Sequence, residues 1–300
     1  MESSVLTALL MPIALGVIML GLGLSLTVAD FKRVVLYPKA VAVGLCCQLI
    51  LLPAICFGLT LSFGLSPELA VGLMLLSASP GGPTANLYSH LFNGDLALNI
   101  TLTAVNSVLA LFTLPLIVNL SINYFMKSGQ VVPMEFQKVL EIFLIVLIPV
   151  SIGMFMKSRS PGITHKIEKT IKILSALFLI LIIVAVIIKE KENIGSYFKQ
   201  AGLSSLTFNV ISLVLAFSLA KLFKIEHRQS IAIAMEAGIH NGTLAIYIAL
   251  SIIGNSMISI PSVIYSIIMF FTAAIFGFII NSPKNASTPV HLGIDEKFRY

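Results

Sequence analysis

Nine long apolar runs divide the chain, and they restrict its fold more than any other feature of the sequence. Most are about 17–25 residues long, the length of α-helix needed to cross a hydrocarbon core of about 30 Å. With 57% apolar and only 11% charged residues, a soluble domain would lack the charged surface that keeps it dispersed. We therefore expect an all-α membrane protein with nine transmembrane helices. The runs cover residues 5–27, 40–65, 68–91, 96–124, 138–156, 173–188, 202–220, 229–253 and 259–281.

The distribution of basic residues predicts how these spans are oriented. Cytoplasmic loops carry an excess of Lys and Arg. If the N-terminus lies outside, fourteen of the 19 Lys and Arg residues fall on the cytoplasmic side. We expect a multi-pass protein of the cell (inner) membrane, with residues 1–281 as a single transporter domain and 282–300 as a cytoplasmic tail. This topology accounts for the net charge of +6, so no nucleic-acid partner is expected.

Two of the runs contain residues that interrupt a helix at their centre. The third has two prolines and two glycines between Pro80 and Pro83, and in the eighth Gly238 and Gly242 bracket three residues. Unwound backbone within a bilayer is tolerated where protein or a water-filled cavity satisfies its polar groups. A single break is equally explained by a kinked structural helix. Two breaks, five spans apart and so crossing the membrane in opposite directions, indicate an inverted repeat with a binding site at the midplane.

Glu236, in the eighth run, is interpreted as the only carboxylate within the nine apolar cores. A charge at that depth is costly, and no Lys or Arg lies at comparable depth, so its partner should be a bound cation, a proton or a set of hydrogen-bond donors. Asn99, Thr103 and Asn106 form one helical stripe that could supply oxygen ligands for Na⁺. Such a stripe could equally join transmembrane helices.

The half-helices that follow the two breaks predict the type of substrate. Their N-termini, near Thr84–Asn86 and Asn241–Thr243, expose N–H groups and a positive dipole end, which attract an anionic group. A small organic anion is therefore expected as the substrate. Glu236 and His240 are four residues apart, but no HExxH motif or third ligand accompanies them, so an intramembrane hydrolase is not expected.

These residues also carry a family resemblance. The chain resembles the bile acid:sodium symporter family, close to its bacterial members, from the first span to about residue 281. The similar stretches are GLGLSLTVADF (residues 21–31), Gln48 within CCQLILLP, SPGGPTAN (79–86), NGDLALNITLT (93–103) and EAGIHNG (236–242).

The resemblance implies a particular architecture and set of ligands. It implies a core of spans 2, 3, 4, 7, 8 and 9 beside a panel of spans 1, 5 and 6, with the two broken helices crossing at the midplane. It also implies two Na⁺ sites and a substrate site. One Na⁺ site falls on Asn86, Asn99, Thr103 and Glu236; the second falls on Gln48, Glu236, Ala237, Ile239 and His240; and the substrate faces Pro83, Thr84 and Asn241.

The chain departs from the family pattern at three positions, of which His240 bears most on the coupling ion. Ala85 and Pro83 stand where Ser and Thr are common, and His240 stands where Gln is common. An imidazole prefers softer metals than Na⁺ and titrates near neutrality, so either a weakened second Na⁺ site or partial proton coupling is expected.

The overall prediction is sodium-coupled symport, with one or two Na⁺ ions, of a bile-acid-like or small pantoate-like anion by alternating access. The alternatives are a proton-coupled organic-anion transporter and, from a different class, a passive channel or a membrane sensor. No enzymatic activity is predicted.

Overall fold

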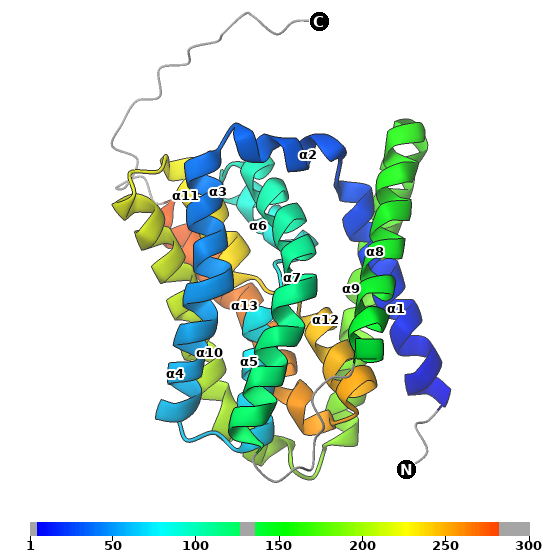
Figure 1. Cartoon of the computed structure of the whole chain (residues 1–300), viewed down its shortest axis with the longest axis vertical. Coiled ribbons are helices and arrows are strands. Elements are labelled where there is room, and N and C mark those ends of the chain that lie inside the picture. Colours follow the sequence, from blue (N-terminus) through cyan, green and yellow to red (C-terminus); the bar gives the residue numbers. More distant parts are fainter. Residues whose placement is uncertain (1–4, 127–135, 282–300) are drawn as a thin grey trace, which may run out of the picture.

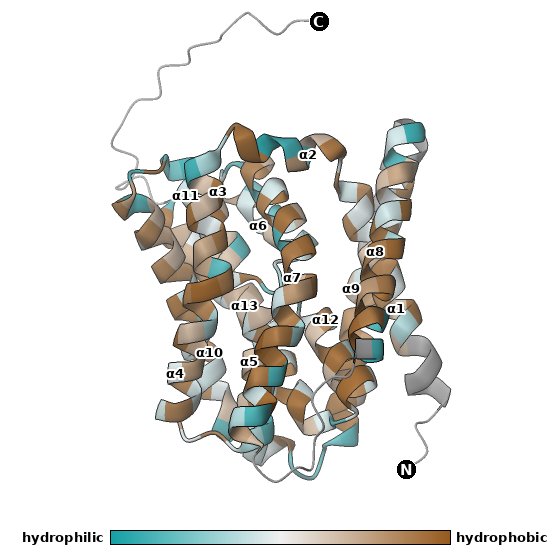
Figure 2. Cartoon of the chain, viewed as in Figure 1, coloured by the Kyte–Doolittle hydropathy of each residue, from teal (hydrophilic) through white to brown (hydrophobic). Residues whose placement is uncertain are grey.

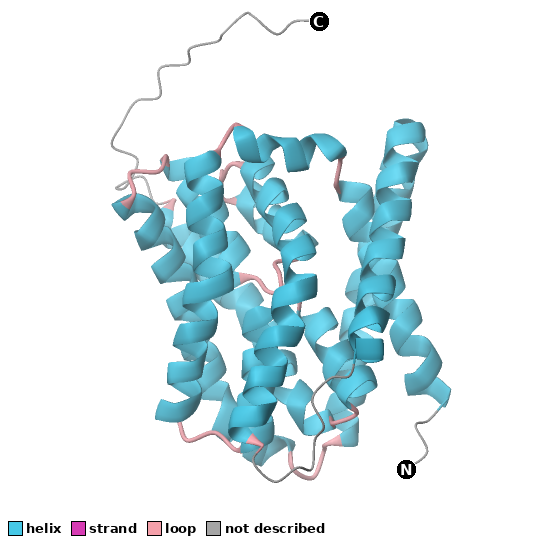
Figure 3. Cartoon of the chain, viewed as in Figure 1, coloured by secondary structure: helices cyan, strands magenta, loops and turns pink. Residues whose placement is uncertain are grey.

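The computed structural model describes residues 5–126 and 136–281, and it is helical throughout (Figures 1 and 3). None of the described residues belongs to a strand, as the all-α prediction requires. The predicted tail at 282–300 lies outside the described residues. The helices are α1 Val5–Ser25, α2 Val28–Lys32, η1 Arg33–Val35, α3 Pro38–Cys46, η2 Cys47–Leu51, α4 Leu52–Ser62, α5 Pro67–Ala78, α6 Pro83–Leu91, α7 Leu96–Phe125, α8 Phe136–Arg159, α9 Pro161–Lys189, α10 Ile194–Leu222, α11 His227–Gly238, α12 Gly242–Tyr247, η3 Ile248–Ile253 and α13 Ser256–Ile280.

Among the described residues, five helices are long and apolar enough to cross a membrane. They are Pro38–Ser62, Leu96–Phe125, Gln137–Arg159, Ile194–Leu222 and Ser256–Ile280. A sixth candidate is a pair of helices, Met11–Ser25 and Val28–Val35, bent by 68°. The other predicted spans contain shorter apolar helices, so a count of nine depends on including the short helix Ile173–Lys189 and on treating the broken segments as single spans.

The surface of the long helices suits a hydrocarbon environment. Figure 2 shows apolar residues over much of their length, with hydrophilic residues gathered toward the ends. On α7, Phe112, Leu116 and Leu120 are each at least 60% exposed and recur every four residues, which places them on one helical face. Large apolar side chains exposed in this pattern are typical of a lipid-facing surface, and the chain is a multi-pass membrane protein.

Both predicted breaks are present. The third run divides into α5 and α6, and the eighth into α11 and α12. Residues 79–82 and 239–241 form short loops inside the helical bundle, about halfway along its length (Figure 3). Pro83 begins α6, where its missing N–H group breaks no helical hydrogen bond.

Helices α1, α8 and α9 pack together on one side of the molecule (Figure 1). The backbones of α1 and α8 are in close contact, because a Cβ atom at Gly23 would collide with the backbone of Val150, and one at Gly153 would lie 2.6 Å from Leu20 O. Small residues allow this kind of close approach between membrane helices. Helix α9 is longer than the predicted run 173–188 because it begins at Pro161, in a polar segment that extends beyond the apolar stretch.

Candidate functional site

The two breaks meet in the interior of the protein. Gly81 and His240 form an isolated antiparallel bridge, and the Asn241 N–H group donates to Pro80 O at 2.8 Å. Each loop therefore supplies a hydrogen-bond partner for a backbone group of the other loop that no longer has a partner within its helix. This explains how two interrupted helices are tolerated inside an apolar bundle. The two interrupted segments therefore contact one another at their breaks.

Glu236 lies beside this crossing, two residues before the end of α11, and is only 3% exposed. Its Oε2 atom accepts hydrogen bonds from Thr103 Oγ1 at 2.6 Å and from Asn99 Nδ2 at 3.0 Å. The second N–H of Asn99 donates to Asn86 Oδ1 at 3.0 Å. The structure thus brings together the carboxylate, two members of the predicted α7 stripe and Asn86 of α6.

Gly81 allows the carboxylate to lie directly against the first break. A Cβ atom at this position would collide with the Glu236 carboxylate, whereas one at Gly82 would meet no atom within 4 Å. The glycine is therefore required by the close approach of a side chain from the other broken segment.

Several buried polar atoms around Glu236 have no hydrogen-bond partner among the residues that the structure describes. A buried polar atom left unpaired costs about 1–3 kcal/mol, and more if charged, so such a group of atoms indicates a ligand. Most of these atoms are oxygens, which are the ligands that hard cations prefer. They are Glu236 Oε1, Asn99 Oδ1, Gln48 Oε1 and both amide atoms of Asn106.

No group of three or more His, Cys, Asp or Glu residues able to hold a metal occurs in the described part of the chain. The oxygen-rich surroundings of Glu236 contain a single carboxylate together with neutral amide and hydroxyl groups. This composition suits a monovalent hard cation better than a transition metal, which prefers imidazole or thiolate ligands.

In each broken span, an amide side chain from a neighbouring helix donates a hydrogen bond to the backbone at the end of the first half-helix, α5 or α11. Gln48, in the π-helical turn of η2, donates to Ser79 O at 3.1 Å, just after α5. In the same way, Asn209 of α10 donates to Gly238 O at 2.8 Å, at the end of α11. Asn209 was not predicted, although it is a lone amide in an apolar run, as Gln48 is.

His240 is buried, and its neighbours determine which ring nitrogen carries the proton. Tyr265 donates its hydroxyl proton to Gly238 O at 2.9 Å, so the contact of 3.0 Å between its oxygen and His240 Nδ1 requires Nδ1 to be the donor. The neutral ring then has a free lone pair on Nε2, which is buried with no partner. Tyr265 was also missed, because an aromatic residue in an apolar run carries no distinctive signal.

Two further residues predicted for the second ion site, Ala237 and Ile239, flank the end of α11. Both are buried, at 2% and 0% exposed. Their side chains are apolar, so only their backbone carbonyl groups could bind an ion.

A cavity of about 570 Å³ lies between the crossing and the helices α1, α8 and α9. All three predicted substrate residues line it: Pro83, Thr84 and Asn241. The side-chain oxygen of Asn241 is occupied as the N-cap of α12, accepting from Leu244 N at 3.1 Å, while its Nδ2 is buried and unpaired. The amide nitrogen is therefore available to donate to a ligand.

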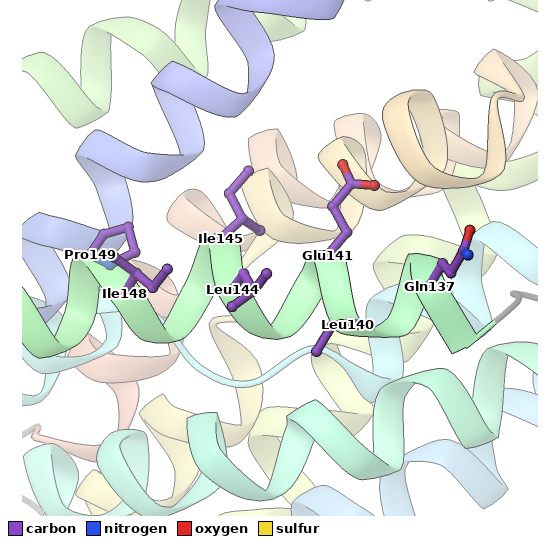
Figure 4. Close-up of a pocket in the computed structure, with 7 residues that line it drawn as sticks. All are labelled: Gln137, Leu140, Glu141, Leu144, Ile145, Ile148 and Pro149. Carbon is purple, nitrogen blue, oxygen red and sulfur yellow. The ribbon is translucent and has the colours of Figure 1, made fainter.

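At the other end of α8 and α9, two acidic side chains contact the rest of the bundle. Glu141 Oε1 accepts a hydrogen bond from Tyr247 at 3.1 Å, and Glu190 Oε1 accepts one from Ser256 at 2.6 Å. In Figure 4, the Glu141 carboxylate points away from Leu140 and toward neighbouring helices. The prediction that Glu236 is the only carboxylate within the apolar cores was wrong, because Glu141 lies inside the fifth run.

The shallow hollow of about 450 Å³ drawn in Figure 4 is lined by α8 alone. Apart from Gln137 and Glu141, its lining residues are apolar. It is a feature of the helix surface and holds no cluster of binding groups.

Comparison with known proteins places the chain among sodium-dependent transporters. Residues 12–197 match the model of the Sodium Bile acid symporter family. The uncharacterised sodium-dependent transporter YocS of Bacillus subtilis (strain 168) is 31% identical, over 85% of this chain and 78% of that protein. The ileal sodium/bile acid cotransporter of Homo sapiens is 28% identical over 91% of this chain and 79% of its own length. The probable sodium/metabolite cotransporter BASS2, chloroplastic, of Oryza sativa subsp. japonica is 27% identical over 87% of this chain and 61% of its own.

Proposed function

Because this chain belongs to the sodium bile acid symporter family, whose members are sodium-dependent transporters and not enzymes, we propose that it couples the entry of Na⁺ to the symport of an organic anion. The observation that carries the proposal is the buried Glu236 carboxylate at the crossing of two broken helices. One of its oxygens has no hydrogen-bond partner in the described part of the chain.

In this proposal, one Na⁺ ion binds beside Glu236 with Asn86, Asn99 and Thr103. The unpaired Glu236 Oε1 and Asn99 Oδ1 atoms support it, because a cation would satisfy both oxygens and neutralise the buried charge.

A second Na⁺ ion is proposed at Gln48, Glu236, Ala237, Ile239 and His240. The free Gln48 Oε1 atom supports this site. His240 weakens it, because its Nε2 atom offers a nitrogen lone pair where an amide oxygen would suit Na⁺ better.

The nine-span topology and the inverted repeat are also proposed. They are supported by the matched capping of Ser79 by Gln48 and of Gly238 by Asn209. Each capping amide comes from the span that precedes the broken one, as expected if spans 2–4 and 7–9 repeat one another. The same division makes α1, α8 and α9 the panel, and the remaining spans the core.

We further propose that this conformation is inward-open. With the N-terminus outside, Ser25 at the end of α1 lies toward the cytoplasm, and the 570 Å³ cavity is lined on that side by Ser25, His90 and Lys157, each near the end of its helix. Toward the outer side, the interface between panel and core contains a cavity of only about 10 Å³, which is lined mostly by apolar side chains. Alternating access would exchange the open and closed sides.

The proposed function is tested by uptake of organic acids into proteoliposomes. An inward Na⁺ gradient should drive accumulation of pantoate or cholate above the external concentration, whereas a proton gradient alone should not. Concentrative uptake driven by protons without Na⁺ would favour the proton-coupled alternative, in which His240 carries the proton. Simple equilibration under either gradient would indicate a passive channel.

Replacing Tyr247 by phenylalanine tests the proposed outer closure. The substitution removes the hydrogen bond to Glu141, and we expect the inward-open to outward-open ratio to fall about fivefold, the effect of losing one partly exposed hydrogen bond of about 1 kcal/mol. Spin labels at the exposed positions Lys138 and Ser251 would report the change as a larger population at long distance.

The matched control for this variant is Tyr124→Phe, which removes a hydroxyl group from an exposed position on α7. An unchanged distance distribution in Tyr247→Phe would contradict the outer closure.

A further inference from the structure

Among the described side chains of the panel that line the cavity, one is cationic. Besides apolar residues, the panel contributes Ser25, Lys157 and Ser175 to the lining. No Asp or Glu lies among the lining residues that the structure describes. The sequence prediction placed Lys157 in a cytoplasmic loop, where its charge served only to set the topology.

The position of Lys157 is fixed by the end of α1. Its Nζ atom donates to Ser25 O at 2.6 Å, a carbonyl group in the last turn of α1. An ammonium group has three N–H donors, so two remain for a ligand. Within the described part of the chain, no ion pair connects Lys157 to a carboxylate.

Polar residues line the cavity at different depths. Thr84 and Asn241 lie at the level of the crossing, and His90 lies about 9 Å further along α6 at 1.5 Å per residue. Lys157 lies near the end of α8, toward the same cytoplasmic side. Apolar side chains, including Leu87 and Leu179, complete the lining.

We propose that Lys157 binds the anionic group of the substrate. The charged end of the substrate then lies toward the mouth of the cavity, and its uncharged polar groups face Asn241. This inference rests on the proposed transport function. It revises the expectation that the half-helix N-termini near Thr84 and Thr243 hold the charge, because a full positive charge attracts a carboxylate more strongly than a helix end does.

The test compares cholate with its neutral analogue, in which the carboxylate is reduced to a primary alcohol. Binding of each to the purified full-length protein in Na⁺ is measured by calorimetry. Wild type should prefer cholate. In Lys157→Gln, the Kd for cholate should rise about tenfold and that for the alcohol should stay within about twofold, because glutamine can still donate to Ser25 O but carries no charge.

Two variants control for other roles of the charge. Lys157→Arg should retain the preference for cholate. Arg159→Gln removes a positive charge two residues away, from an exposed side chain that packs over the Phe155 ring and does not line the cavity, and it should leave both affinities unchanged.

An equal loss of affinity for both ligands in Lys157→Gln would assign the lysine a structural role and overturn the inference. The absence of a charge preference in wild type would also overturn it. If the charge preference is present but Na⁺-driven uptake is not, the inference stands for binding, and the proposed function fails on its own.

Discussion

Replacing Glu236 by glutamine is expected to lower Na⁺-driven uptake by about 100-fold or more while leaving the protein folded. Glutamine has nearly the same shape and can still accept hydrogen bonds from Asn99 and Thr103, but it carries no charge to balance a cation. Removing one partner of a buried, paired charge costs about 3–5 kcal/mol, and each 1.4 kcal/mol corresponds to a factor of ten in affinity. Uptake in proteoliposomes and binding of radioactive Na⁺ to the purified protein measure the effect.

Glu226→Gln is the matched control, because Glu226 is exposed at the start of the same helix, α11. It should transport as wild type does. Na⁺ binding and uptake within about threefold of wild type in Glu236→Gln would show that the buried carboxylate is not a cation ligand, and the coupling mechanism would have to lie elsewhere.

The sequence was sufficient to locate the breaks, because their cause is local. Proline lacks the N–H group that a helix needs, and glycine disfavours helical backbone, so the groups at Pro80–Pro83 and Gly238–Gly242 weaken their helices through the residues themselves. The grouping of Glu236 with Asn99 and Thr103 was expected from the family resemblance, because the helical stripe alone is equally consistent with ion ligands and with packing between helices.

What could not be predicted depends on tertiary contacts. Asn209 and Tyr265 are single polar side chains in apolar runs. The sequence does not distinguish a polar residue that joins two helices from one that supports a binding site. In the structure, both side chains donate hydrogen bonds to Gly238 O. Lys157 was assigned to a loop, and Glu141 was overlooked. A position near a helix end does not indicate whether a cavity or another helix lies beside it.

The crossing itself explains why the two breaks depend on one another. Pro80 O accepts from the Asn241 backbone, and the carboxylate of Glu236 rests against Gly81. A change in the first loop therefore acts directly on the ion ligand of the second broken segment. This dependence gives the second prediction with a large expected effect.

Replacing Gly81 by alanine should lower Na⁺-driven uptake by about 100-fold and weaken Na⁺ binding by a similar factor. The new Cβ atom would occupy the space of the Glu236 carboxylate, so either the carboxylate must turn away from Asn99 and Thr103 or the bridge between Gly81 and His240 must open. Both outcomes leave buried polar groups unpaired, at a cost of about 1–3 kcal/mol each. The melting temperature should fall as well, and less so in saturating Na⁺ if some binding remains.

Gly82→Ala provides a close control, because it adds the same methyl group one residue away. A Cβ atom there meets no atom within 4 Å, and the φ angle of −124° suits alanine. Uptake by this variant should stay within about threefold of wild type. Equal loss in the two alanine variants would mean that the loop tolerates no side chain for reasons unrelated to Glu236. A large loss confined to Gly81→Ala would place the coupling ion at the contact between the two broken helices.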